Sequence, residues 1–241
     1  MEDIELQIWH EEKRTRWREL LGPWYNFWHF GTLTTGAMAG ENLEEHRKSL
    51  DGVFYDHMTY NDLPLIVAWD KKAKKVAGFL FSTSRTVEKT NRKAVIPTHE
   101  DPKKPVKDLR NFKKHFSNNH IVKKLEEMDY FLRQLHKEGD AFQRYGVDKV
   151  WVISLLSVIP EYTKRGLGSK MSAMVLPLAK ELGYTVMISE VTSYYTQRIL
   201  LEKFQFETIL ELPFSDYSNY SGVPENVKNT HVNALLVAKK L

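Results

Sequence analysis

The feature that most constrains the fold is a buried strand that turns through two glycines into a helix. Residues 150–156 are apolar on both faces, which is typical of a strand in the middle of a sheet. The chain then passes through Gly166-Leu-Gly168 into a helical pattern. Glycine permits positive φ and close approach to a ligand, and the amides at a helix start favour anions such as a pyrophosphate. The sequence therefore predicts an anion-binding turn here, to which Lys164 and Arg165 add positive charge.

Two other nucleotide-binding motifs do not fit this turn. A dinucleotide-binding fingerprint needs a third glycine where Met171 stands, and a P-loop needs Gly-Lys-Ser/Thr after four intervening residues. One alternative stays open, in which Gly166 and Gly168 only permit a tight turn between strand and helix.

The rest of the chain alternates between strand and helix patterns, and this order predicts an α/β fold with a mixed sheet. The sequence predicts strands at 3–9, 65–69, 76–82, 150–156, 185–191, 206–212 and 231–239, and helices at 13–29, 42–58, 121–135, 166–182 and 192–204. Gly22-Pro23 is expected to interrupt or end the first helix, 31–36 to form a loop, and Pro177 to bend its helix. No linker divides the chain, so residues 1–241 are expected to form a single domain.

Composition excludes several classes of protein. The 241 residues carry a net charge of +4, are 42% apolar and include no cysteine. Such a chain can bury a core, and it has no disulfide, no Cys-liganded zinc and no Cys nucleophile. No metal is expected. The start of the chain lacks the pattern of a signal peptide and no apolar run is long enough to span a bilayer, so a cytoplasmic protein without membrane contact is expected.

Much of the positive charge falls in a segment expected to be a basic loop insert at about 85–118. Pro97, Pro102 and Pro105 break this segment, which argues against a folded nucleic-acid-binding platform. A solvated loop that steers an anionic ligand toward a nearby site is the favoured interpretation.

The order of elements and the turn together resemble the GCN5-related N-acetyltransferase (GNAT) superfamily. Thr163-Lys-Arg-Gly166-Leu-Gly168 is similar to its Gln/Arg-x-x-Gly-x-Gly/Ala signature, with Thr163 as the departure. The resemblance implies the GNAT acyl-CoA N-acyltransferase fold, a mixed sheet of the seven-stranded type flanked by helices, with acetyl-CoA as cosubstrate. It also implies that the strand Leu156-Ser157-Val158 pairs with the pantetheine arm. The implied coenzyme-binding residues are Leu156, Ser157, Val158, Lys164, Arg165, Gly166, Leu167, Gly168, Ser169, Thr192 and Thr196.

Within that superfamily the chain resembles insect arylalkylamine N-acetyltransferases. The phrase from Glu190 to Arg198 is similar to that group's Thr-Ser-x-x-Ser-x-Arg helix, and 215–217 and 231–239 are similar to its C-terminal hairpin. Thr192 and Thr196, four residues apart, are expected on one helical face toward the coenzyme. Gln205 replaces the group's glycine, and its acidic Asp-Glu-Pro-Leu motif is absent from 30–38. Either the general base has moved or the substrate differs.

The resemblance implies direct transfer of an acetyl group to a small primary amine such as dopamine, tyramine or serotonin. Glu190 and His231 are the candidate bases, a backbone N–H at 156–158 is the expected oxyanion donor, and Tyr194, Tyr195 or Thr196 is expected to protonate the thiolate. Two alternatives stay open: a polyamine or protein N-terminal acetyltransferase, and a non-catalytic acyl-CoA-binding module. The sequence leaves the oligomeric state open.

Overall fold

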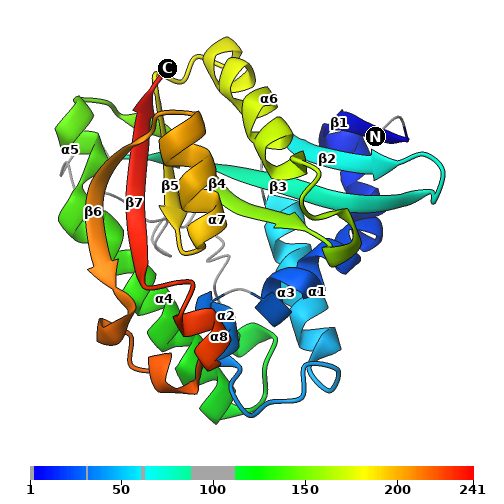
Figure 1. Cartoon of the computed structure of the whole chain (residues 1–241), viewed down its shortest axis with the longest axis vertical. Coiled ribbons are helices and arrows are strands. Elements are labelled where there is room, and N and C mark those ends of the chain that lie inside the picture. The colour runs from blue at the N-terminus through cyan, green and yellow to red at the C-terminus, as the bar shows by residue number, and fades with distance from the viewer. Residues whose placement is uncertain (1–2, 31, 61–62, 88–111) are drawn as a thin grey trace.

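The computed structural model describes residues 3–30, 32–60, 63–87 and 112–241, and a seven-stranded mixed sheet organises them (Figure 1). The strand order is β1-β2-β3-β4-β5-β7-β6. The strands are β1 (Ile4–Trp9), β2 (Leu65–Asp70), β3 (Lys75–Thr86), β4 (Lys149–Val158), β5 (Val186–Val191), β6 (Glu207–Pro213) and β7 (Asn233–Lys240). β4 and β5 pair in parallel, and the other neighbouring strands pair antiparallel. The predicted fold class is confirmed.

Helices cover both faces of the sheet, because each face presents apolar side chains that must be buried. The helices are α1 (Leu21–Phe30), α2 (Thr32–Ala37), α3 (Arg47–Tyr60), α4 (Asn119–Gly139), α5 (Ala141–Tyr145), α6 (Leu167–Glu181), α7 (Tyr194–Arg198) and α8 (Glu225–Lys228). Side chains from α1 to α5 share one core cluster with one face of the sheet, and α6 packs with the other face. None of the described helices is long and apolar enough to cross a membrane.

The N-terminal helices agree with the sequence prediction only in part. The predicted helix 13–29 is divided near Gly22-Pro23, as expected, into a 3₁₀ helix, Glu11–Leu20, and α1, which has Gly22-Pro23 in its first turn. Proline is tolerated there because the N–H it lacks has no partner within the helix. The expected loop at 31–36 is also wrong, since α2 spans Thr32–Ala37. A Cβ on Gly36 would lie 3.1 Å from the Tyr217 ring and 2.9 Å from Val223, so glycine allows α2 to pack closely against these two residues.

Two further predicted boundaries shift. α3 begins at Arg47, whereas a cap was expected at Asn42; the Asn42 side chain instead accepts a hydrogen bond from the Glu44 N–H within a preceding turn (3.1 Å). The predicted helix 192–204 becomes α7 followed by a π-helical turn, Ile199–Lys203. α6 continues through Pro177.

The expected insert lies largely outside the described residues, which stop at Val87 and resume at Phe112. At its C-terminal side a short 3₁₀ turn, Phe112–Lys114, is attached to α3 through Asp56. The Asp56 carboxylate accepts from Lys114 Nζ (2.8 Å) and contacts His115 Nε2 (2.7 Å). Burial raises the pKa of Asp56, but these two partners outweigh burial and lower it overall.

Candidate functional site

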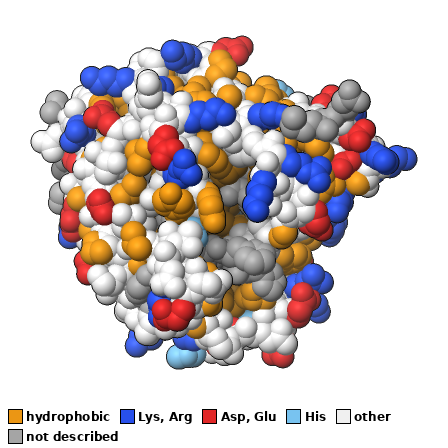
Figure 2. Space-filling model, viewed as in Figure 1, with side chains coloured by type: hydrophobic (Ala, Val, Ile, Leu, Met, Phe, Trp, Pro, Cys, Tyr) orange, Lys and Arg blue, Asp and Glu red, His pale blue; other side chains and the backbone are white. Residues whose placement is uncertain are grey.

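The sheet opens between β4 and β5. Their paired positions run from Trp151–Met187 to Ile153–Ser189. β4 then continues to Val158 and β5 to Val191 as the two strands separate. A cavity of about 1090 Å³ lies at this opening. Figure 2 shows a hollow on this face of the molecule, with hydrophobic and Lys or Arg side chains around it.

The end of β4 presents backbone groups to the opening. The Ile159 N–H donates to Ala77 O on β3 (2.9 Å). Because peptide groups alternate in direction along a strand, those of Leu156 and Val158 face away from β3. Val158 O accordingly accepts from Asn26 Nδ2 of α1 (3.0 Å). This edge of β4 can pair with an extended ligand as a further strand would.

The turn after β4 ends in a helix start that lines the cavity. Gly166 caps α6 with φ of 71°, and Lys164 also adopts positive φ, 59°. The Lys170 N–H makes the first hydrogen bond of the helical ladder, to Gly166 O (3.0 Å), so the N–H groups of 167–169 belong to the first turn. Residues 166–169 and Lys164 line the cavity. Such a helix start suits a pyrophosphate.

Tyr162 attaches this turn to the β2–β3 hairpin. Its hydroxyl donates to Asp70 Oδ2 (2.6 Å), and burial together with this bond raises the pKa of Tyr162 to about 12. The Arg165 guanidinium lies 4.9 Å from the centroid of the Tyr162 ring and donates to Glu161 O (2.9 Å). Arg165, which the sequence predicted to bind the coenzyme, therefore makes its contacts within the turn and is not among the residues that line the cavity. Lys164 lines the cavity, as predicted.

Glu190, a predicted base, lines the cavity at the end of β5. Its carboxylate accepts from Arg85 Nη2 of β3 (3.0 Å) and contacts His136 Nε2 of α4. Arg85 Nη1 also contacts His136 Nε2. We call these three residues the Arg85–His136–Glu190 cluster. An ionised carboxylate beside a guanidinium is a weaker base than an isolated one.

His231, the other predicted base, is held in one tautomer. Its Nδ1 accepts the Tyr194 N–H at the start of α7 (2.9 Å), so the neutral ring carries its proton on Nε2. Burial lowers the pKa of His231. His231 lines the cavity and packs edge-on against Tyr195, with ring centroids 5.9 Å apart. Because Nε2 already holds a proton, His231 is arranged to donate a hydrogen bond.

The two threonines line the cavity, but not for the predicted reason. α7 begins at Tyr194, so Thr192 precedes the helix and does not share a helical face with Thr196. Gln197 fixes α7 on the sheet through Asn233, with its Nε2 donating to Asn233 O (3.1 Å) and Oδ1 (2.9 Å).

Of the predicted site residues, the cavity is lined by Leu156, Ser157, Val158, Lys164, Gly166, Leu167, Gly168, Ser169, Glu190, Thr192, Tyr195, Thr196 and His231. Tyr194 and Arg165 are not among the lining residues. Tyr194 contributes its N–H to His231, and its ring lies 42% exposed beside Tyr195.

Several lining residues escaped the sequence analysis. Asn26 reaches the end of β4 from α1, and the Ser157 hydroxyl donates to Pro23 O of the same helix (2.7 Å). More than 130 residues separate these partners, and no local pattern in 23–26 reveals the contact. Tyr162, in contrast, lies inside the turn that the sequence did identify.

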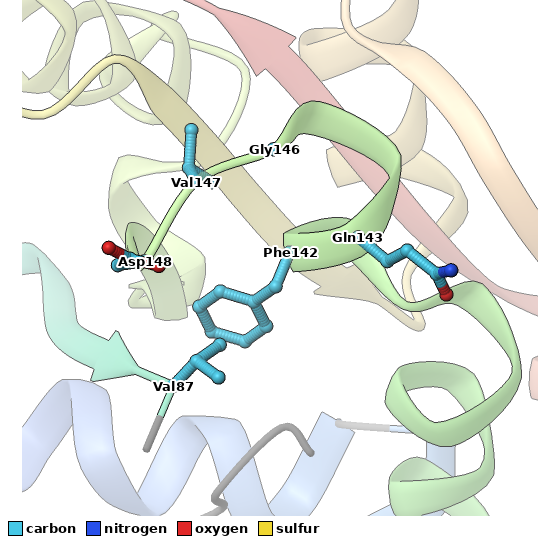
Figure 3. Close-up of a pocket in the computed structure, with 6 residues that line it drawn as sticks. All are labelled: Val87, Phe142, Gln143, Gly146, Val147 and Asp148. Carbon is cyan, nitrogen blue, oxygen red and sulfur yellow. The ribbon is translucent and has the colours of Figure 1, made fainter. Parts of the chain in front are cut away.

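A second hollow of about 330 Å³ lies between α5 and the start of β4 (Figure 3). Its lining includes Val87, Phe142 and Asp148, with the Phe142 ring beside Val87. Among the residues that the structure describes, its polar lining side chains are Gln143 and Asp148. Within the described part of the chain, no group of three or more His, Asp or Glu side chains could hold a metal ion.

Comparison with solved structures identifies the fold. The mosquito arylalkylamine N-acetyltransferase like 5b is 22% identical over 99% of this chain and 100% of its own, with a TM-score of 0.64. Arylalkylamine N-acetyltransferase 2 from Aedes aegypti is 19% identical over 99% of each chain, with a TM-score of 0.65. A Drosophila melanogaster polyamine N-acetyltransferase that forms N-acetylagmatine is 15% identical over 99% of this chain and 100% of its own, with a TM-score of 0.63.

Sequence comparison gives no corresponding match, either to a protein-family model or to a curated protein. The structural similarity extends over nearly the whole chain. The chain therefore has the fold of the GCN5-related N-acetyltransferases.

Proposed function

We propose that this chain transfers the acetyl group of acetyl-CoA directly to a primary amine, and that its preferred acceptors are arylalkylamines such as tyramine, dopamine or serotonin. One observation carries the proposal. A single cavity joins the edge of β4 beyond its pairing with β5, the first turn of α6 and the Glu190 carboxylate. Those three features match the three parts of the reaction: an extended thioester arm, an anionic coenzyme end and an amine that must lose a proton.

The cavity fits acetyl-CoA in two places. The first-turn N–H groups at 167–169, with Lys164 beside them, suit the pyrophosphate, and the edge of β4 at Leu156 and Val158 suits the amide groups of the pantetheine arm. A backbone N–H of the same edge would donate to the oxyanion that develops on the thioester carbonyl. Tyr195 and Thr196 supply lining hydroxyls for the departing thiolate.

Charge in the cavity favours a monoamine acceptor over a polyamine. Glu190 is paired with Arg85 (3.0 Å) and Glu202 with Arg198 (3.0 Å). In the lining that the structure describes there is no third carboxylate, and a diamine would need one for its second cation. Phe27 and Tyr195 add aromatic surface to the lining. The similar solved structures include both arylalkylamine and polyamine enzymes, so this charge argument bears directly on the choice.

The test is a panel of amines with acetyl-CoA, followed by release of free CoA. We expect tyramine, dopamine or serotonin to give a higher kcat/KM than spermidine or agmatine. A preference for spermidine or agmatine would contradict the proposed acceptor and leave acetyl transfer in place. Binding of acetyl-CoA is measured separately as a rise in melting temperature, since a ligand of the folded state stabilises it by RT ln(1 + [L]/Kd). Binding without acetylation of any amine would favour a non-catalytic acyl-CoA-binding module.

A further inference from the structure

The Arg85–His136–Glu190 cluster brings three ionisable side chains together beneath the cavity from three separate elements, β3, α4 and β5. Their side chains are 12%, 7% and 11% exposed, respectively. Burial of this kind is costly unless the charges are paired, so their arrangement requires a physical reason. Glu190 lines the cavity, and the two other residues reach the cavity through it.

The contacts of His136 Nε2 suit both protonation states of the ring. A neutral imidazole nitrogen without a proton can accept a hydrogen bond from Arg85 Nη1. A protonated nitrogen can instead donate to Glu190 Oε1. One ring atom thus has a donor and an acceptor in reach, and His136 finds a partner whether or not it holds a proton.

Other described groups of the lining are poorly suited to accept a proton. His231 Nε2 already carries one, because Nδ1 accepts the Tyr194 N–H. The pKa of Tyr162 is raised to about 12, so its hydroxyl stays protonated and bound to Asp70. Glu202 is an exposed partner of Arg198 at the far end of the π-helical turn.

We propose that Glu190 and His136 together accept the proton of the substrate ammonium, with Glu190 as the group that meets the amine and His136 as the site where the proton rests. This inference depends on the proposed acetyl transfer. An N–H bond of the ammonium breaks as an O–H bond forms on Glu190, and the proton then moves to His136 Nε2. The free amine attacks the thioester carbonyl, its second proton leaves on the CoA thiol, and His136 returns the stored proton to water. One proton is released per turnover, as the overall reaction requires.

Among the residues that the structure describes, apolar side chains also pack near the end of α4 that carries His136. β6 and β7, which pack on the same end of α4, present Ile209, Leu210 and Leu236 toward Gly139, one turn from His136. On α4 itself, Arg133 is paired with Asp129 (2.5 Å). Within the described part of the chain, Arg85 and Glu190 are the charged groups that contact His136 Nε2.

His136→Gln separates proton transfer from structural support. A glutamine amide can accept from Arg85 and donate to Glu190 at the same time, but it cannot take up a proton near neutral pH. We expect kcat/KM to fall roughly 10²-fold or more and the acidic limb of its pH profile to disappear, with the affinity for acetyl-CoA unchanged. His46→Gln is the matched control, since His46 contacts Glu41 (3.3 Å) away from the cavity. Wild-type activity and pH profile in His136→Gln would overturn the proposal.

A second measurement does not need turnover. In protein labelled at histidine, the ring resonances that disappear in His136→Gln are followed by NMR between about pH 5 and 9. We expect His136 to titrate in this range, and its midpoint to fall by about one pH unit in Glu190→Gln, where the protonated ring loses a charged acceptor. A ring that does not titrate, or whose midpoint is the same in both proteins, would overturn the proposal. If no amine is acetylated but this coupling is present, the failure lies in the proposed function.

Discussion

The two halves of the cavity are built in different ways. The half that we propose for the acetyl donor, called the donor half below, is one continuous stretch, residues 153–169, that includes the end of β4 and the start of α6. The half that we propose for the amine, called the acceptor half, combines the end of β5, α7 with its π-helical turn, residues 226–231 and Asn26–Phe27 of α1. A continuous half depends on local sequence, whereas the assembled half depends on how distant elements pack. A substitution in the donor half should therefore affect the residues next to it in the chain. In the acceptor half, a substitution in one element should also affect the other elements packed against it.

The halves also differ at their helix ends. The donor half enters α6 through Gly166 at φ of 71°, and glycine adopts this conformation without strain. The acceptor half leaves its π-helical turn through Gln205 at φ of 55°. A side chain with a Cβ is strained there, by roughly 1–2 kcal/mol. The helix start of the donor half is thus relaxed at Gly166, although Lys164 two residues earlier has φ of 59°, and the helix end of the acceptor half is strained at Gln205.

Among substitutions at the turns of the two halves, the largest expected effect comes from Gly166→Ala. The methyl group would strain the turn and project into open space beside the cavity, so we expect acetyl-CoA to bind about tenfold more weakly or worse, a loss of about 1.4 kcal/mol. Gly183→Ala is the matched control, because Gly183 has φ of 76° at the other end of α6. Both variants should lose similar stability. Equal acetyl-CoA affinity in the two, measured by calorimetry, would contradict the assignment of the donor half.

Gly168 offers a less direct test of the same turn. A Cβ on Gly168 would lie 3.2 Å from Ile199 Cδ1 and 3.6 Å from Leu156 Cδ2. A substitution there would therefore move the π-helical turn as well as the helix start. A Cβ on Gly166, in contrast, would meet no described atom within 4 Å, so this substitution does not press on the acceptor half.

The comparison also explains what the sequence could predict. The apolar strand 150–156 and the two glycines follow from local chemistry, and the structure has β4 and the α6 start where these residues indicate. The helix at 32–37 has no clear local signal, and its Gly36 packs against Tyr217 and Val223, which are distant in the chain. The partners of Glu190 could not be predicted either, since Arg85 and His136 lie 105 and 54 residues away in the chain.

A smaller effect is expected from Gln205→Gly. Glycine would relieve the positive φ at the end of the π-helical turn, and this gain is partly offset by the greater freedom of glycine in the unfolded chain. We expect the protein to become more stable by about 0.5–1 kcal/mol, measured by urea unfolding. Gln205→Ala is the control, because alanine keeps a Cβ and should bring no gain. Stabilisation by alanine but not by glycine would show that the strain argument is wrong.

The smallest effect is a pH dependence confined to the acceptor half. Burial holds the pKa of His231 below its ordinary value of about 6.5, so between the two pKa values the unfolded chain binds a proton that the folded protein does not. Wild-type protein should therefore lose stability relative to His231→Asn as pH falls below about 6.5, and the two should keep a constant difference above it. In the donor half, Tyr162 has a pKa of about 12 and stays neutral throughout this range.

The predicted loss of stability is tested by the melting temperatures of wild-type protein and His231→Asn at about pH 8 and pH 5.5. If the two melting temperatures differ by the same amount at both pH values, the folded protein binds a proton at His231 as readily as the unfolded chain does. The tautomer that we assign from the Tyr194 N–H would then be wrong.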